Sequence, residues 1–209
     1  MEAILIPVKR FDEAKLRLAG VLGPGARRRL VLSMLGDVLD AAAAWPLRLL
    51  VTSDADAAMV AERAGWSIVP DPGAGLNAAV TAGTHRAVAE EAAALLVLPF
   101  DVPLVTPGEL TELFAIDADV IVSRSDDGGT TGLLRRPPGA IDARFGPASA
   151  VAHADAARRA GLRVRSLRLP GLALDVDDPA DLRLLATSAA PNGSVQLARE
   201  LLVAPEPRS

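Results

Sequence analysis

Residues 94–101 read Ala-Leu-Leu-Val-Leu-Pro-Phe-Asp, an apolar run that ends in a proline and a carboxylate. Five apolar residues in a row are typical of a strand that is buried on both faces, as the strands of a parallel sheet are. Pro99 ends the run, and Asp101 follows it with a carboxylate. Because ligands of open α/β sheets bind beyond the carboxyl ends of the strands, we expect Asp101 at a functional site.

Before this strand, short apolar runs alternate with longer helical patterns. Apolar residues recur with i, i+4 spacing in the helical patterns, as they do on the buried face of a helix. This order predicts a single-domain, three-layer α/β fold whose central sheet is mostly parallel, with helices on both faces. The expected strands are 3–8, 47–52 and 66–69, and the expected helices are 24–44, 54–64 and 76–90.

The second half of the chain is less regular, and we expect it to add an antiparallel edge to the sheet. Thr106, Pro107 and Glu109 predict an N-cap, a proline at N1 and a capping-box acid, so a helix should begin there. Beyond Ser188 the sequence carries Pro and Asn-Gly, which predicts a domain over 1–188 and a loosely ordered tail over 189–209. Further strands are expected over 119–123, 130–134, 162–169 and 172–176, and helices over 147–160 and 178–186.

Composition excludes several classes of protein. There is no cysteine, so disulfides and thiolate metal sites are excluded, and only two histidines argue against zinc. A metal would be a hard cation held by carboxylates. The net charge of −4 gives no support to a nucleic-acid partner. No apolar run approaches the ~20 residues of a membrane span, and the N-terminus lacks a signal-peptide pattern, so we expect a cytoplasmic protein without a membrane partner.

Four loops follow the expected strands, and the first carries the cations Lys9, Lys15 and Arg17. Such a loop, here residues 9–20, can wrap a polyphosphate, because lysine supplies a point charge and arginine a bidentate fork. An exposed amphipathic turn explains the same pattern equally well.

The second loop, residues 71–77, contains Gly73-x-Gly75-x-x-Ala78 after a strand. The pattern is similar to a dinucleotide fingerprint, which would favour a dehydrogenase. Two prolines separate the strand from the glycines, and the motif follows the third strand rather than the first, so this interpretation is the weaker one. A glycine turn at a helix start still allows a nucleotide to approach closely, with Gly75, Leu76 and Asn77 as contacts.

The third and fourth loops carry carboxylates. Asp101 follows the apolar strand, and Asp175 and Asp177 are spaced to lie on one face of an extended segment. Close carboxylates repel each other unless a cation lies between them, and Mg²⁺ takes carboxylates together with phosphate oxygens. Asp178 before Pro179 fits a plain helix cap, but Asp175 follows an apolar run and has no capping role.

A further pair of segments combines glycines with hydroxyls. Thr130 and Thr131 follow two glycines, and Gly146 and Pro147 precede Ser149. Proline at N1 predicts a helix start with free amides, which binds phosphate or carboxylate, and the hydroxyls add donors. An ordinary helix cap accounts for the second segment equally well.

Taken in order, these residues resemble a known family. The chain over 3–186 is similar to the guanylyltransferases of coenzyme F420 biosynthesis, which act on 2-phospho-L-lactate or phosphoenolpyruvate. The motifs that carry the resemblance are Lys-Arg…Ala-Lys-x-Arg-Leu (9–18), Leu-Asn-x-Ala (76–79), Asp-x-Pro (101–103), Gly-Thr (129–130), Phe-Gly-Pro-x-Ser-x3-His (145–153) and Asp-Val-Asp-x-Pro-x-Asp-Leu (175–182).

The resemblance implies a compact nucleotidyltransferase fold and a role for each matched residue. Phe100 departs from the glycine that many nucleotidyltransferases have there, and whether Thr130 or Thr131 is the acid ligand stays open. The implied roles are Mg²⁺ binding by Asp101, Asp175 and Asp177, binding of the phosphorylated acid by Thr130 or Thr131, Gly146 and Ser149, contact with the GTP phosphates by Lys9, Lys15 and Arg17, and contact with the guanosine side by Gly75, Leu76 and Asn77. Lys9, Lys15, Arg17 and Asp101 would form the catalytic set.

The implied reaction is an in-line attack of the acid's phosphate on the α-phosphorus of GTP, with pyrophosphate leaving. The nucleophile is already an anion, so no general base is required. The expected partners are GTP and a small phosphorylated carboxylic acid, with the next enzyme of the pathway as a further candidate that would receive an unstable product. The composition indicates a GC-rich bacterial genome, which favours phosphoenolpyruvate. The alternatives are a related nucleotidyltransferase that uses 3-phosphoglycerate, molybdopterin or a sugar phosphate, and a non-catalytic nucleotide-binding module.

Overall fold

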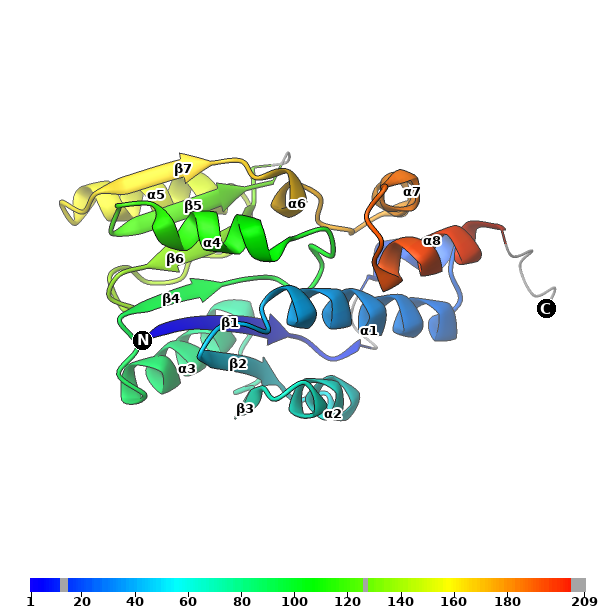
Figure 1. Cartoon of the computed structure of the whole chain (residues 1–209), viewed down its shortest axis with the longest axis horizontal. Coiled ribbons are helices and arrows are strands. Elements are labelled where there is room, and N and C mark those ends of the chain that lie inside the picture. The colour runs from blue at the N-terminus through cyan, green and yellow to red at the C-terminus, as the bar shows by residue number, and fades with distance from the viewer. Residues whose placement is uncertain (12–14, 126–127, 204–209) are drawn as a thin grey trace.

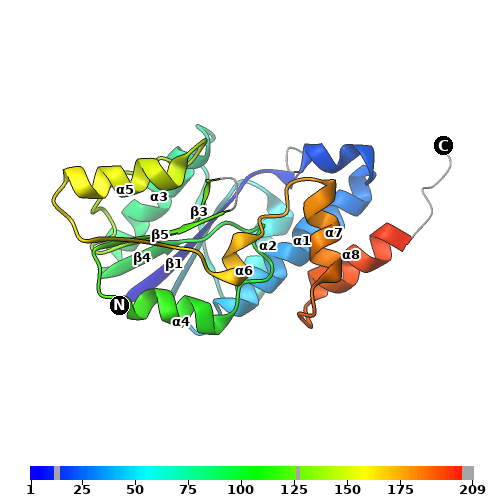
Figure 2. The same ribbon diagram turned by 90° about the horizontal axis from the view of Figure 1, so that it is seen from above.

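The computed structural model describes residues 1–11, 15–125 and 128–203. Over these residues seven strands join in one sheet of order β3-β2-β1-β4-β6-β5-β7, with helices on both faces (Figures 1 and 2). The predicted single-domain, three-layer α/β fold is confirmed. The strands are β1 (Glu2–Val8), β2 (Leu47–Thr52), β3 (Ser67–Pro70), β4 (Ala94–Val97), β5 (Val120–Arg124), β6 (Thr130–Arg135) and β7 (Val164–Leu167). The helices are η2 (Leu16–Gly20, a 3-10 helix), α1 (Pro24–Ala41), α2 (Ala55–Arg63), α3 (Leu76–Ala89), α4 (Pro107–Ala115), α5 (Ser149–Arg159), α6 (Pro170–Ala173), α7 (Pro179–Thr187) and α8 (Gly193–Val203).

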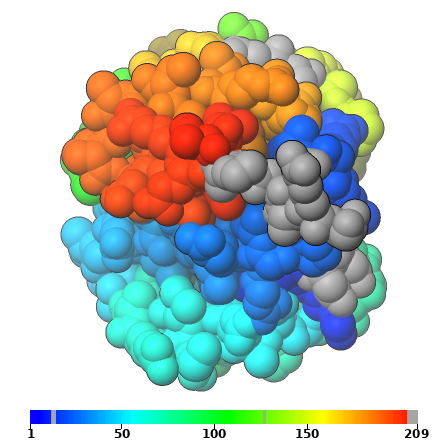
Figure 3. Space-filling model, turned by 90° about the vertical axis from the view of Figure 1, so that its right-hand side faces the viewer, coloured from blue at the N-terminus to red at the C-terminus, as the bar shows by residue number. Residues whose placement is uncertain are grey.

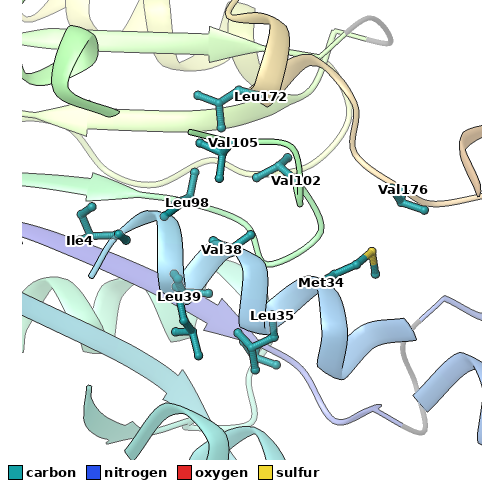
Figure 4. Close-up of a cluster of buried hydrophobic side chains, with 14 of the residues drawn as sticks. Ile4, Met34, Leu35, Val38, Leu39, Leu98, Val102, Val105, Leu172 and Val176 are labelled. Carbon is teal, nitrogen blue, oxygen red and sulfur yellow. The ribbon is translucent and has the colours of Figure 1, made fainter. Parts of the chain in front are cut away.

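The central strands are apolar without interruption because both faces of the sheet are covered. Ile4 and Ile6 of β1 belong to a core that includes α1, α2 and α4, whereas Leu5 belongs to a second core with α3 and α5. Figure 4 shows the first core, in which Ile4 and Leu98 lie beside the α1 side chains. Each of these residues is fully buried, so the site at the strand ends is built on a rigid support.

The antiparallel part of the sheet differs from the prediction of an antiparallel edge. Strands β1 to β4 pair in parallel, and β6 pairs antiparallel with both β4 and β5, so it lies inside the sheet. β7 pairs parallel with β5 at the edge. The short connection between Arg124 and Thr130 explains the antiparallel pairing of β5 with β6, since a parallel return needs a crossover of a dozen residues or more.

The prediction of a strand over 172–176 is also wrong. Pro170 opens the single helical turn α6, and residues 174–178 continue as an irregular segment. Proline is favoured at the first position of a helix, where its missing N–H is not needed, so the turn forms in place of a strand. The segment still carries Asp175 and Asp177 past the strand ends, since the Val176 N–H donates to the Asp101 carbonyl at 2.9 Å.

The prediction of a loosely ordered tail over 189–209 is wrong for residues 193–203, because these residues form α8. Its first N–H groups, those of Gly193 and Ser194, donate to the Asp37 carboxylate of α1 at 3.1 and 2.8 Å. Val195 and Ala198 are buried in the core that includes α1. Figure 3 shows α8 lying across α1 beside α7. The Asn-Gly pair therefore starts a helix rather than a loose end, and residues 204–209 lie outside the described part.

Within the described ranges, none of the helices combines the length and apolar character that crossing a membrane requires.

Candidate functional site

A cavity of about 390 Å³ opens at the carboxyl ends of the parallel strands. Pro7 of β1 and Val97 of β4 line its floor. Because β6 runs in the opposite direction, it is its first residues, Thr130 and Thr131, that reach the same edge. One reversed strand thus brings hydroxyls to a place where the neighbouring strands supply carboxylates and cations.

The cavity gathers most of the residues that the sequence singled out. It does not include Arg17, Gly75 or Asn77, which are treated separately below. The convergence of distant loops on one edge follows from the parallel strand order. The predicted residues that line the cavity are Lys9, Lys15, Leu76, Asp101, Thr130, Thr131, Gly146, Ser149, Asp175 and Asp177.

Lys15 lies at the acidic end of this cavity and joins two of the predicted carboxylates. Its Nζ donates to Asp101 Oδ2 at 2.6 Å and also to Asp177 Oδ1, and it lies 5.4 Å from the centre of the Phe100 ring. The residue has a left-handed backbone (φ 55°) and is 9% exposed. Burial by itself would lower the pKa of Lys15, but the two carboxylates outweigh it, so its pKa is raised. Lys15 is a buried ammonium in this state.

The three carboxylates predicted to share a metal are not assembled as a trio. Among residues 1–11, 15–125 and 128–203, no three Asp, Glu or His side chains are close enough to hold one ion. Asp101 and Asp177 nevertheless converge on the same point, which the ammonium of Lys15 occupies, and Asp175 lines the cavity beside them. Two converging carboxylates are a set that Mg²⁺ can use, because it takes one or two carboxylates together with substrate phosphates.

The opposite end of the cavity is built from β6 and the start of α5. The helix begins at Ser149, two residues later than expected, because Ala148 adopts a left-handed backbone (φ 53°) and ends the preceding turn. The expected free amides are partly used, since the Ser149 N–H donates to the Gly146 carbonyl at 3.1 Å and the Ala150 N–H to the Gly128 carbonyl at 3.4 Å. The hydroxyls of Ser149 and Thr130 are therefore the stronger candidates for anion contacts.

The two threonines at the start of β6 have different partners. The Thr131 hydroxyl lies 3.4 Å from the hydroxyl of Ser123 on β5. The Thr130 hydroxyl lies 3.0 Å from Nδ1 of His153, a fully buried residue of α5. Both threonines line the cavity, but only Thr130 is linked, through His153, to the loop before α5. This arrangement favours Thr130 as the ligand of a bound anion.

Asn77 does not face the cavity as expected for a nucleotide contact. Its side chain pairs in both directions with the backbone of Phe145: Nδ2 donates to the carbonyl at 3.0 Å, and Oδ1 accepts from the N–H at 2.7 Å. Both polar atoms of the Asn77 amide thus form hydrogen bonds with a residue 68 positions away in the chain. Asn77 fixes the loop before α5, and Phe145 lines the cavity.

A second cavity of about 360 Å³ adjoins the first, because Pro7, Lys9 and Leu76 line both. Gly75 lies in its wall with φ 91°, a backbone that favours glycine. Asp71 also lines it and accepts a hydrogen bond from the Gly73 N–H at 2.9 Å. The glycine turn that the sequence associated with a nucleotide thus borders a cavity that shares part of its lining with the first.

Arg17 lies outside both cavities and is exposed on η2. Asp178, as expected, caps α7 by accepting from the N–H groups of Ala180 and Asp181 at 2.7 and 3.1 Å. These backbone hydrogen bonds lower the pKa of Asp178, and the positive charge of Arg17 adds to the effect. The loop of residues 9–20 therefore divides, with Lys9 and Lys15 turned to the cavity and Arg17 turned to the surface. Residues 12–14 of this loop lie outside the described part.

Two functional candidates were missed as such in the sequence. His153 and Phe145 lie at the two ends of the motif of residues 145–153, and no role is predicted for either of them. The signal that could have found His153 is its position four residues after Ser149, which places both on one face of a helix. Nothing in the sequence indicates that Asn77 pairs with a loop so distant in the chain.

Solved structures with a similar fold indicate the class of protein. A protein from Desulfovibrio desulfuricans G20, provisionally named a nucleotide-diphospho-sugar transferase, has a similar structure with a TM-score of 0.80, at 21% identity over 95% of this chain and 94% of that one. Molybdopterin-guanine dinucleotide biosynthesis protein A from Archaeoglobus fulgidus matches with a TM-score of 0.54, at 14% identity over 88% and 96% of the two chains. The fold is thus one that nucleotidyltransferases have.

The family follows from the sequence matches. The model of the family described as "Guanylyl transferase CofC like" matches residues 2–205. A phosphoenolpyruvate guanylyltransferase from Rubrobacter xylanophilus is 40% identical over 190 residues, which are 88% of this chain and 93% of the relative. One from Chloroflexus aggregans is 38% identical over 201 residues, 91% and 100% of the two chains. The chain belongs to the CofC-like guanylyl transferases.

Proposed function

We propose that this chain transfers the guanylyl group of GTP to phosphoenolpyruvate in coenzyme F420 biosynthesis. The relatives that cover most of the chain at close to 40% identity carry the name of that activity. The single structural observation that carries the proposal is one cavity with two unlike ends. Lys15 and two carboxylates, Asp101 and Asp177, form one end, and hydroxyls with a helix start form the other. The first end suits a triphosphate with its cation, and the second suits a small acid.

The proposed chemistry needs positioning more than proton transfer. A phosphate oxygen of the acceptor attacks the α-phosphorus of GTP, a P–O bond forms, and the bond from that phosphorus to the bridging oxygen of the β-phosphate breaks, so that pyrophosphate leaves. The attacking oxygen is already ionised at neutral pH, so the site has no need of a base. The obstacle is the repulsion between two polyanions, which Lys9 and Lys15 reduce at the nucleotide end.

We propose Mg²⁺ as the cation of this site, with Asp101 and Asp177 as its ligands and Asp175 beside them, because these two carboxylates converge on one point. When bound, Mg²⁺ would neutralise charge on the phosphates. The chain itself would hold the two carboxylates at one point. The phosphates of the bound nucleotide would offer Lys15 an alternative partner. The ammonium of Lys15 occupies that point in this structure, so Lys15 would turn to the phosphates for the two carboxylates to be free to hold an ion.

The second, adjoining cavity is the proposed place of the guanosine. Gly75 and Leu76 border it, which agrees with their predicted role, whereas Asn77 would act through the loop that it holds. A related nucleotidyltransferase with a bulky acceptor is the alternative. The hydroxyl end of the main cavity, which Phe145 also lines, favours a small acid.

Mass spectrometry of the product separates these acceptors. GTP and Mg²⁺ are mixed with phosphoenolpyruvate, 2-phospho-L-lactate or 3-phosphoglycerate, and pyrophosphate release is measured in parallel. We expect the adduct with phosphoenolpyruvate to form fastest. Asp101→Asn should abolish turnover while its melting temperature stays close to that of the wild type. Near-normal pyrophosphate release by this variant, or no adduct with any of the three acids, would contradict the proposal.

A further inference from the structure

His153 is a fully buried histidine with a defined partner at each ring nitrogen. Nε2 lies 2.8 Å from the backbone N of Arg144, and Nδ1 lies 3.0 Å from Oγ1 of Thr130. The ring of Phe145 meets the imidazole edge-on, with the ring centroids 5.0 Å apart. One side chain of α5 therefore contacts both walls of the cavity end formed by β6 and the loop before α5.

These contacts determine the tautomer of His153. A backbone N–H can only donate, so Nε2 must accept from Arg144 and cannot carry a proton. Burial, with the positive charges of Arg135 and Arg144, lowers the pKa of His153 to about 4, so the ring is neutral near pH 7. The single ring proton then lies on Nδ1, which donates to the Thr130 hydroxyl oxygen.

The direction of that hydrogen bond determines what Thr130 can do. Its hydroxyl has one proton, and Nδ1 of His153 is already a donor, so the hydroxyl proton must point elsewhere. Within the described ranges Thr130 Oγ1 has no other hydrogen-bond partner, and Thr130 lines the cavity. Ionised phosphate and carboxylate oxygens only accept hydrogen bonds. A hydroxyl that is held as a donor is therefore ready to donate to them.

We propose that His153 is a positioning residue for the acceptor: by donating from Nδ1 it turns the Thr130 hydroxyl into a fixed donor to the anionic acid. The inference rests on the proposed function for the identity of the acid. The same histidine, through Nε2, holds the loop of residues 144–146, which Asn77 holds from the other side through Phe145. The acceptor end is thus preorganised before the acid binds, which lowers the cost of binding.

The first test observes the tautomer directly. The chain has two histidines, His85 and His153, so a ¹⁵N-histidine spectrum is simple, and the His85→Gln variant assigns it. We expect a protonated Nδ1 and an unprotonated Nε2 for His153 near pH 7, and a shift of the Nδ1 resonance in Thr130→Val. A proton on Nε2, or a charged ring, would overturn the proposal. This measurement needs neither substrate, so it remains decisive even if the acceptor assignment fails.

The second test is kinetic and uses matched variants. His153→Gln keeps an acceptor near the position of Nε2 and loses the donor to Thr130, whereas His153→Asn keeps a donor near the position of Nδ1. We expect His153→Gln to raise the KM for phosphoenolpyruvate roughly tenfold or more, the loss of one hydrogen bond to a charged group, with the KM for GTP nearly unchanged. His153→Asn should have a smaller effect, and the exposed control His85→Gln none.

A double-mutant cycle tests the route through Thr130. If His153 acts through Thr130, His153→Gln combined with Thr130→Val should raise the acceptor KM no more than Thr130→Val does. Additive effects, or equal changes in the KM values of GTP and phosphoenolpyruvate, would refute the positioning role. If the His153 variants melt early, the ¹⁵N spectra of the wild type and Thr130→Val still decide, because they report the tautomer of an unaltered His153 and its bond to Thr130. Absence of pyrophosphate release by the wild type would count against the proposed function alone.

Discussion

The ammonium of Lys15 is the residue-scale feature on which the acidic end of the site depends. Its Nζ contacts Asp101 and Asp177, and the left-handed backbone at Lys15 aims the side chain inward. In the absence of a second cation these contacts separate two like charges that would otherwise face each other. Removing the ammonium should therefore make the two carboxylates a stronger divalent site.

We predict that Lys15→Met raises the stabilisation by Mg²⁺ in the absence of GTP. Without the competing ammonium, the ion binds the native state more tightly, and a ligand that binds only the native state raises the melting temperature. The measurement is the change in melting temperature between buffers with and without MgCl₂. Lys9→Met is the matched control, since Lys9 lines the same cavity and is exposed. An equal response of the wild type and Lys15→Met to Mg²⁺ would argue against this competition.

His153 makes stability depend on pH in a predictable direction. Its pKa is about 4 in the folded chain and 6.5 when unperturbed, so between these values the unfolded chain binds a proton that the folded chain does not. Stability is therefore complete above about pH 6.5 and is lost as the pH falls toward about 4. Urea unfolding at pH 7 and pH 5 should show a loss about 2 kcal/mol greater in the wild type than in His153→Gln. The wild-type difference should persist in His85→Gln, and parallel losses in all three proteins would contradict the prediction.

At the scale of elements, α3 packs unusually close to the sheet. A Cβ at Gly83 would overlap the Leu5 side chain and lie 2.9 Å from Cγ2 of Val51. Leu5 and Val51 are fully buried in the core, so neither side chain has room to move away. The close approach holds α3 against the sheet, and Leu76, the first residue of this helix, lines both cavities.

Gly83→Ala should lower the free energy of unfolding by about 1–3 kcal/mol, the usual cost of overpacking a core. Gly36→Ala on α1 is the control, because nothing lies within 4 Å of a Cβ there. This control should gain up to about 1 kcal/mol from the better helix propensity of alanine. Chemical denaturation measures the free energy of unfolding of both variants. Stabilisation by both substitutions would show that α3 can move away from the sheet.

Some features of these elements could be predicted from the sequence, and others could not. The apolar strand before Asp101, the alternation of strands and helices, and the helix caps at Thr106 and Asp178 were predictable because they depend on neighbours in the chain. The position of β6 inside the sheet and the pairing of Asn77 with Phe145 were not, because both depend on which distant segments meet. Lys15 was expected to meet phosphates, and its bridge between carboxylates appears only when the loops are brought together.

At the scale of the whole molecule, α8 extends the core beyond the part that the motifs cover. Leu197 packs into the core that contains α1, whereas Val203, at the end of the same helix, is 83% exposed. Arg199 donates from Nε to the Ala186 carbonyl at 2.9 Å, which attaches α8 to α7. Since Asp177 lies directly before α7, the packing of α8 also supports the carboxylate end of the site.

Leu197→Ala should therefore lower the free energy of unfolding by about 2–5 kcal/mol, as loss of a buried leucine side chain does. Val203→Ala should change it by less than about 0.5 kcal/mol, since exposed substitutions seldom do more. Urea denaturation of both variants provides the measurement. Equal stability of the two would mean that α8 contributes little to the fold.

The reversed direction of β6 has a consequence for how such an enzyme can diversify. One continuous segment, residues 128–153, supplies the wall of hydroxyls and the helix start, while the first half of the chain supplies the glycine turn and the lysines. Changes that suit a different acid can accumulate in that segment, without altering the surfaces that we propose for the nucleotide. A lineage could then retain its donor and exchange its acceptor through a short run of substitutions.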